Sequence, residues 1–103
     1  MTDATKALLA ELLEAAEAQL AAARTLDAAG LDAATERRHA SMVAISAGPR
    51  IDPEELRPHF EALQQVDKRL TRILNAGDRT FRRVLIKDQQ TYNKFGRMAR
   101  GGR

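Results

Sequence analysis

The side chains best suited to chemistry in this sequence are two histidines and two serines, because there is no cysteine. A zinc site needs three or four His, Cys or carboxylate ligands close together, and neither His39 nor His59 has a second ligand at the usual spacing. Ser41 and Ser46 lack the strand, turn and helix context of a nucleophile elbow. We therefore expect no enzyme active site, no metal and no cofactor.

The carboxylates are similarly uninformative about catalysis. Glu11, Glu14 and Glu17 recur every three residues, which is typical of a solvated helix face and not of an acid/base pair. No glycine-rich phosphate loop is present, since AGP and AGD stand alone. The chemistry of this chain is therefore expected to be that of binding.

Charge divides the chain into two unequal parts. Residues 1–66 hold 6 Lys and Arg against 11 Asp and Glu, a net charge of −5, whereas residues 67–103 hold 11 against 3, a net charge of +8. The two parts either neutralise each other or one of them recruits an external partner. No apolar run is long enough to cross a bilayer, and acidic residues interrupt what would be the apolar stretch of a signal peptide. These features predict a cytoplasmic protein without membrane insertion.

The N-terminal part has the periodicity of an amphipathic helix. Apolar residues recur at spacings of three and four from Leu8 to Leu26, and Thr2 or Asp3 is available as the N-cap. Gly30 marks a position where this helix could end, with Asp32 capping a second helix that continues through Ile45. A single helix kinked at the glycine is the alternative.

The segment AISAGPRIDPEEL is the clearest boundary. Gly48 and Pro49 end the preceding helix, while Asp52 and Pro53 occupy the N-cap and first position of a new one. A proline at position 58 removes a backbone hydrogen bond. We therefore expect a short turn first, with the main helix beginning near Pro58.

An apolar stripe then continues in one phase as far as Phe95. This continuity predicts one long, gently bent helix that passes through Gly77 and makes the molecule a rod. The expected fold class is all-α, an elongated antiparallel helical hairpin or three-helix bundle with a long C-terminal helix. Residues 1–96 form the single helical domain, and residues 97–103 form a flexible basic tail.

A rod of two or three helices cannot enclose every apolar position of such a stripe. The C-terminal end of the long helix is therefore predicted to offer a binding face to an amphipathic helix of another protein. The candidate residues are Leu74, Phe81, Val84, Leu85, Tyr92 and Phe95. The competing interpretation is that both rings near the C-terminus pack against the first helix around Leu8 and Leu12, and self-association of the stripe into a homo-oligomer is a further alternative.

The basic residues of the C-terminal part suggest a different class of partner. A cationic stripe is sufficient for non-specific binding of nucleic acid. We favour the interpretation that these residues face Glu11, Glu14, Glu17 and Asp27 on the antiparallel helix, because no aromatic residues are interleaved for base stacking. The basic residues in question are Lys68, Arg69, Arg72, Arg79, Arg82, Arg83, Lys87 and Lys94.

The overall pattern resembles the flagellar export chaperones of the FlgN and FliT type. The likeness lies in LLAELLEAAEAQLAAARTLDAAGLDAATERR and in FEALQQVDKRLTRILNAGDRTFRRVL followed by TYNKFG. It implies a cytoplasmic chaperone that binds the C-terminal helix of a hook-associated or filament-cap subunit and delivers it to the type III export gate. It also implies a substrate groove at Leu74, Phe81, Val84 and Leu85, and a gate-docking tyrosine at Tyr92.

Overall fold

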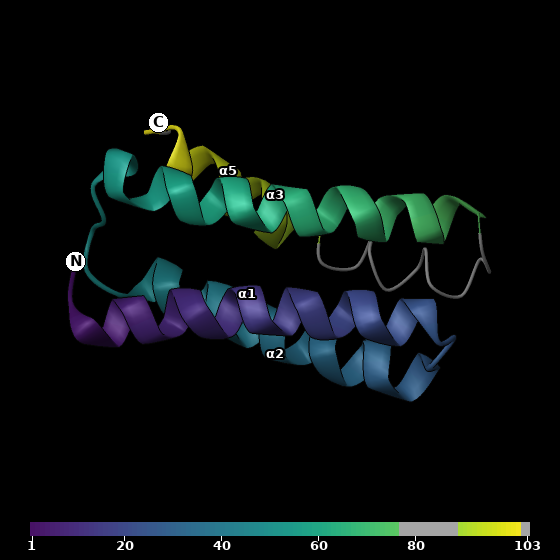
Figure 1. Ribbon diagram of the computed structural model, residues 1–103. Helices are drawn as coiled ribbons and strands as arrows, with labels where there is room; N and C mark the ends of the chain where they lie inside the picture. The colour runs from purple at the N-terminus through teal and green to yellow at the C-terminus, as the bar shows by residue number, and fades with distance from the viewer. Residues whose placement is uncertain (77–88, 102–103) are drawn as a thin grey trace.

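The computed structural model describes residues 1–76 and 89–101 (Figure 1). These ranges contain the helices α1 (Asp3–Arg24), α2 (Ala28–Ala47), α3 (Pro53–Ala76) and α5 (Gln89–Ala99), and no strand. α1 and α3 run in one direction and α2 and α5 in the other, with both chain ends at the same end of the bundle (Figure 1). The predicted all-α fold class is confirmed.

Two of the predicted helix starts are confirmed by their caps. The backbone N–H of Thr5 donates to the Thr2 hydroxyl at 3.1 Å, and that of Glu54 donates to the Asp52 carboxylate at 2.9 Å. α3 begins directly after Asp52, so the prediction that the main helix begins near Pro58 is wrong. Pro58 is exposed and lies in the second turn, where the loss of one intrahelical hydrogen bond is tolerated.

The turn between α1 and α2 comes earlier in the chain than Gly30, where the sequence predicted it. Leu26 has a φ of 56° and the Asp27 carboxylate accepts a hydrogen bond from the backbone N–H of Gly30 at 2.9 Å, so Asp27 and not Asp32 is the N-cap of α2. A Cβ at Gly30 would lie 2.2 Å from the Asp27 carboxylate. The glycine therefore allows the capping carboxylate to approach closely, and it does not end a helix.

The prediction of one helix from Pro58 to Phe95 is wrong. The rings of Phe60 and Phe95 meet edge to face with centroids 5.6 Å apart, whereas a continuous helix would separate them by about 53 Å. The chain therefore reverses direction between α3 and α5. The radius of gyration is 13.4 Å, close to the roughly 13 Å of a compact domain of this length, so the molecule is not the expected rod.

The last helix also extends beyond the predicted boundary at residue 96. α5 continues through Ala99, whose side chain is 1% exposed and belongs to the core. The prediction of a flexible tail from residue 97 is therefore wrong for residues 97–99. The core follows the apolar stripes of the helices, and its largest fully buried side chains are Phe95, Leu31, Met42, Ile45, Leu56, Leu63, Leu70 and Leu74.

Candidate partner-binding surfaces

α5 forms the fourth corner of the bundle, a position that we define by its contacts with α2 and α3. Phe95 packs on Phe60 of α3, and the Ser46 hydroxyl of α2 donates to the Met98 sulfur at 3.7 Å. Gly96 allows the close approach to α3, because a Cβ there would lie 3.0 Å from the Phe60 ring. At 1.5 Å per residue, the 11 residues of α5 extend about 17 Å, against about 36 Å for the 24 residues of α3.

Two of the six predicted partner-binding residues are core residues. Leu74 and Phe95 are each 2% exposed, so the expectation that they remain uncovered is corrected. Phe95 is enclosed by its own chain, although its ring partner is Phe60 and not the first helix. The other predicted positions, Phe81, Val84 and Leu85 and the side chain of Tyr92, lie outside the described residues.

A buried polar network connects the first three helices. Arg38 of α2 donates through Nη1 and Nη2 to the two carboxylate oxygens of Asp67 on α3, at 2.6 and 2.8 Å. The same Nη1 donates to the Gln19 side-chain carbonyl of α1 at 2.8 Å, and the Gln19 amide donates to the Thr35 hydroxyl at 2.8 Å. The side chains of Arg38 and Asp67 are 3% and 14% exposed. Such a bidentate pair fixes the register of the three helices, because a one-turn slip would bury unpaired charges.

Sequence reasoning did not identify Arg38 as an interior residue. Its position contains the signal, because Leu31, Ala34, Arg38, Met42 and Ile45 recur at spacings of three and four on the buried face of α2. A charge on such a stripe requires a partner of opposite sign nearby. Its partner, Asp67, could not be selected from the many carboxylates without the fold.

The acidic residues of α1 are neutralised differently from the prediction. Arg37 of α2 forms ion pairs with Glu11 and with Glu14, the latter at 4.0 Å, and its hydrogen bond to Glu11 raises the pKa of the guanidinium above its ordinary value. Asp27 caps α2. Among the predicted basic partners that the structure describes, Lys68, Arg69, Arg72 and Lys94 form no ion pair with these acids, and Arg79, Arg82, Arg83 and Lys87 lie outside the described residues.

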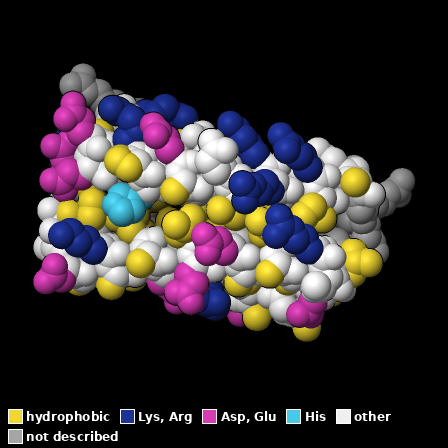
Figure 2. Space-filling model, viewed as in Figure 1, with side chains coloured by type: hydrophobic (Ala, Val, Ile, Leu, Met, Phe, Trp, Pro, Cys, Tyr) yellow, Lys and Arg dark blue, Asp and Glu magenta, His cyan; other side chains and the backbone are white. Residues whose placement is uncertain are grey.

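The C-terminal half of α3, residues 65–76, is cationic on its exposed side, and Figure 2 shows Lys and Arg side chains along the upper half of the molecule. We call Lys68, Arg69 and Arg72 the basic flank; all three are exposed. Throughout residues 1–76 and 89–101, none of the three takes part in an ion pair. The only carboxylate on this half of α3, Asp67, is paired with Arg38.

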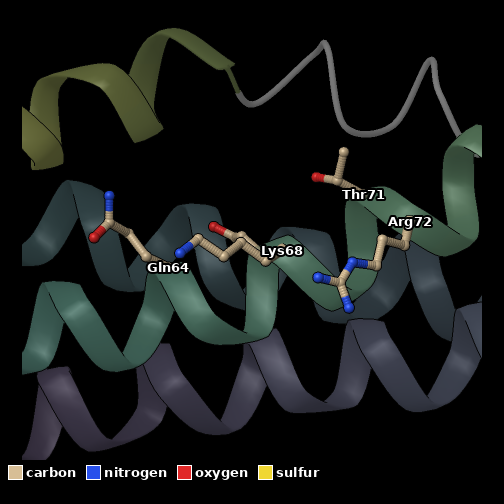
Figure 3. Close-up of a pocket in the computed structure, with 5 residues that line it drawn as sticks. Gln64, Lys68, Thr71 and Arg72 are labelled. Atoms are coloured by element: carbon tan, nitrogen blue, oxygen red, sulfur yellow. The ribbon is translucent and has the colours of Figure 1, made fainter.

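The basic flank borders a shallow hollow of about 300 Å³. Lys68 and Arg72 line it together with Gln64, Asp67 and Thr71, and Figure 3 shows the labelled side chains projecting from successive turns of α3. The hollow therefore combines two cations and neutral hydrogen-bonding groups with one carboxylate, that of Asp67, which is paired with Arg38. This arrangement can bind carboxylate or phosphate oxygens.

A second hollow, of about 470 Å³, lies at the end of the bundle where the chain begins. Met1, Lys6, Glu55 and His59 line it, and the Met1 ammonium group contacts the Glu55 carboxylate at 3.2 Å. His39 and His59 lie on different helices, as predicted. In the part of the chain that the structure describes, no three His, Asp or Glu side chains are placed to hold a metal ion.

None of the described helices is long and apolar enough to span a bilayer. Comparisons of the chain with models of protein families, with characterised proteins and with solved structures find no significant match. Any functional conclusion therefore depends on the two surfaces described above, the fourth corner and the basic flank.

Proposed function

We propose that this protein is a non-enzymatic helix-binding chaperone or adaptor that receives an amphipathic helix of another protein at the fourth corner of its bundle. The sequence resemblance supports a cytoplasmic role in flagellar type III export, with the C-terminal helix of a hook-associated or cap subunit as the guest and Tyr92 as a contact for the export gate. Capture in this way would keep an aggregation-prone helix covered until its delivery.

The observation that carries this proposal is the way in which α5 is held. α5 is amphipathic, and among its described side chains Phe95 packs on Phe60 of α3, Met98 accepts a hydrogen bond from Ser46 of α2, and Gly96 and Ala99 are buried. The fourth corner thus accepts a short amphipathic helix in contact with α2 and α3. A guest helix with more apolar area would compete with α5 for the same surface of α2 and α3, because buried apolar area stabilises such packing by roughly 25 cal/mol per Å².

A crosslink that holds α5 in place tests the proposal. The chain has no cysteine, so a Ser46→Cys/Met98→Cys variant offers two unique thiols at positions whose side chains already meet. A short bismaleimide would join α5 to α2, and the same variant capped with N-ethylmaleimide is the matched control. Binding of fluorescent peptides from the C-terminal helices of hook-associated and cap subunits is measured by anisotropy.

The expected result is that the capped protein binds a peptide and the crosslinked protein does not. Equal binding by both would place the guest elsewhere on the molecule. No binding to any of the peptides by the unmodified chain would refute the proposed function. Phe81→Ala and Leu85→Ala, at predicted contact positions outside the described residues, are expected to reduce capture without loss of helicity.

A further inference from the structure

We infer that the basic flank of α3 selects guest helices that carry acidic residues along one edge. This inference rests on the proposed function and names the chemistry of the guest. It starts from the charges on the C-terminal half of α3, where cations outnumber available carboxylates. Lys68, Arg69 and Arg72 are exposed there, and the one acidic residue of this half, Asp67, is already bound to Arg38.

α5 does not supply the missing negative charge. Gln89–Ala99 contains Lys94 and Arg97 and no Asp or Glu, so the helix that fills the fourth corner is itself cationic. α5 lies along the N-terminal half of α3, since Phe95 meets Phe60 and Gly101 lies close to Pro53, so the basic flank extends beyond it. An acidic guest longer than α5 would reach the flank and be attracted to it, so the exchange of α5 for such a guest would be favoured by charge as well as by apolar area.

The spacing of the flank matches that of a helix edge. Lys68 and Arg72 are four residues apart, so they are neighbours on the surface of α3 and lie about 6 Å apart along its axis. Glu or Asp side chains at the same spacing on a guest packed against α3 would face them in turn. Gln64 and Thr71 line the same hollow and add neutral hydrogen-bonding groups for the carboxylate oxygens.

The hollow favours carboxylate side chains over a nucleic-acid backbone. It has a volume of about 300 Å³ and is lined by side chains of α3, so it accommodates single carboxylate side chains. The two phenylalanine rings that the structure describes, Phe60 and Phe95, are buried, so neither offers a stacking platform for unpaired bases. An acidic helix is thus the partner that this surface fits.

The test uses three synthetic amphipathic peptides with the same apolar face and with Glu, Gln or Lys at two edge positions four residues apart. Anisotropy at low salt is expected to give the highest affinity for the Glu peptide and the lowest for the Lys peptide. In the Lys68→Glu/Arg72→Glu variant the order of affinities is expected to invert, and the affinity for the Glu peptide is expected to fall about tenfold. Lys6→Glu/Arg24→Glu, two exposed cations on α1, changes the net charge equally and is expected to keep the original order.

The possible outcomes separate the two hypotheses. Equal affinity for all three peptides, abolished by the α5 crosslink, would overturn the charge selection and leave the proposed function standing. If the order of peptide affinities also inverts in the Lys6→Glu/Arg24→Glu control, the charge selection is overturned as well, since net charge alone would then explain the effect. Salt-sensitive binding of a labelled DNA duplex that depends on Lys68 and Arg72, without preference among the peptides, would assign the flank to nucleic acid. If no peptide binds at all, the proposed function is refuted, and the charge selection is refuted with it.

Discussion

Asp67→Ala removes both carboxylate acceptors from the buried guanidinium of Arg38 and is expected to destabilise the bundle strongly. The Arg38 side chain is only 3% exposed, so water cannot readily replace the lost partner. Removal of one partner from a buried ion pair typically costs about 3–5 kcal/mol. Because the Asp67 side chain is 14% exposed, some water can reach the Arg38 guanidinium in the variant, and we expect a loss of stability near 3 kcal/mol.

Thermal unfolding followed by circular dichroism at 222 nm measures this loss. For a domain of this size each kcal/mol lowers the melting temperature by about 4–8 °C, so a decrease of roughly 12–24 °C is expected. Arg69→Ala is the matched control, since it removes an exposed charge from the same helix and should change stability by less than about 0.5 kcal/mol.

A double-mutant cycle separates the ion pair from its surroundings. In Arg38→Met/Asp67→Leu both charges are absent, and apolar side chains of similar length fill part of the space. This variant is expected to be more stable than Asp67→Ala, because no uncompensated charge is left inside. The reasoning would be refuted if Asp67→Ala cost less than about 1 kcal/mol of stability. It would also be refuted if the stability losses of the single variants Arg38→Met and Asp67→Leu were additive in the double variant.

Three further predictions concern stability and are checked by urea denaturation. Leu26→Gly is expected to stabilise the protein by up to about 1 kcal/mol, because Leu26 has a φ of 56° and is 69% exposed, whereas Leu26→Ala keeps the strain and should give no gain. Asp27→Ala should cost about 1 kcal/mol through loss of the cap on α2, and Asp27→Asn should retain most of it; equal losses would exclude the capping role. Phe60→Ala is expected to cost about 3–5 kcal/mol and to release α5, so that hydrogen exchange in α5 accelerates more than in α1; uniform exchange would contradict the anchoring by Phe95.

The helices and several of their ends were predictable because they depend on local physics. A capping side chain acts on a backbone N–H two or three residues away, and Thr2 and Asp52 are visible as caps in the sequence itself. Gly48 ends α2 for a similarly local reason. The turn at Leu26 was missed because a leucine in the left-handed region has no sequence signature, and its strain is compensated by the packing of two helices on each other.

The candidate site was predicted less well. Leu74 and Phe95 were predicted to bind a partner, but both are buried within the chain. Periodicity records which face of a helix is apolar and contains no information on what covers that face. The pairing of Glu11 and Glu14 with Arg37 was missed for the same reason, since the sequence could not select the neighbouring helix.

The amino-acid sequence by itself determined that this protein is helical, which residues cap two of its helices, and that its charges are segregated along the chain. These properties arise from interactions within a few residues, which the order of side chains specifies directly. Only the tertiary structure decided that the chain turns back after α3, that Phe95 rests on Phe60, and that Arg38 meets Asp67 inside the bundle. Those pairings join residues far apart in sequence, and each has many competitors of the same type, so they are resolved only by the packing of the whole chain.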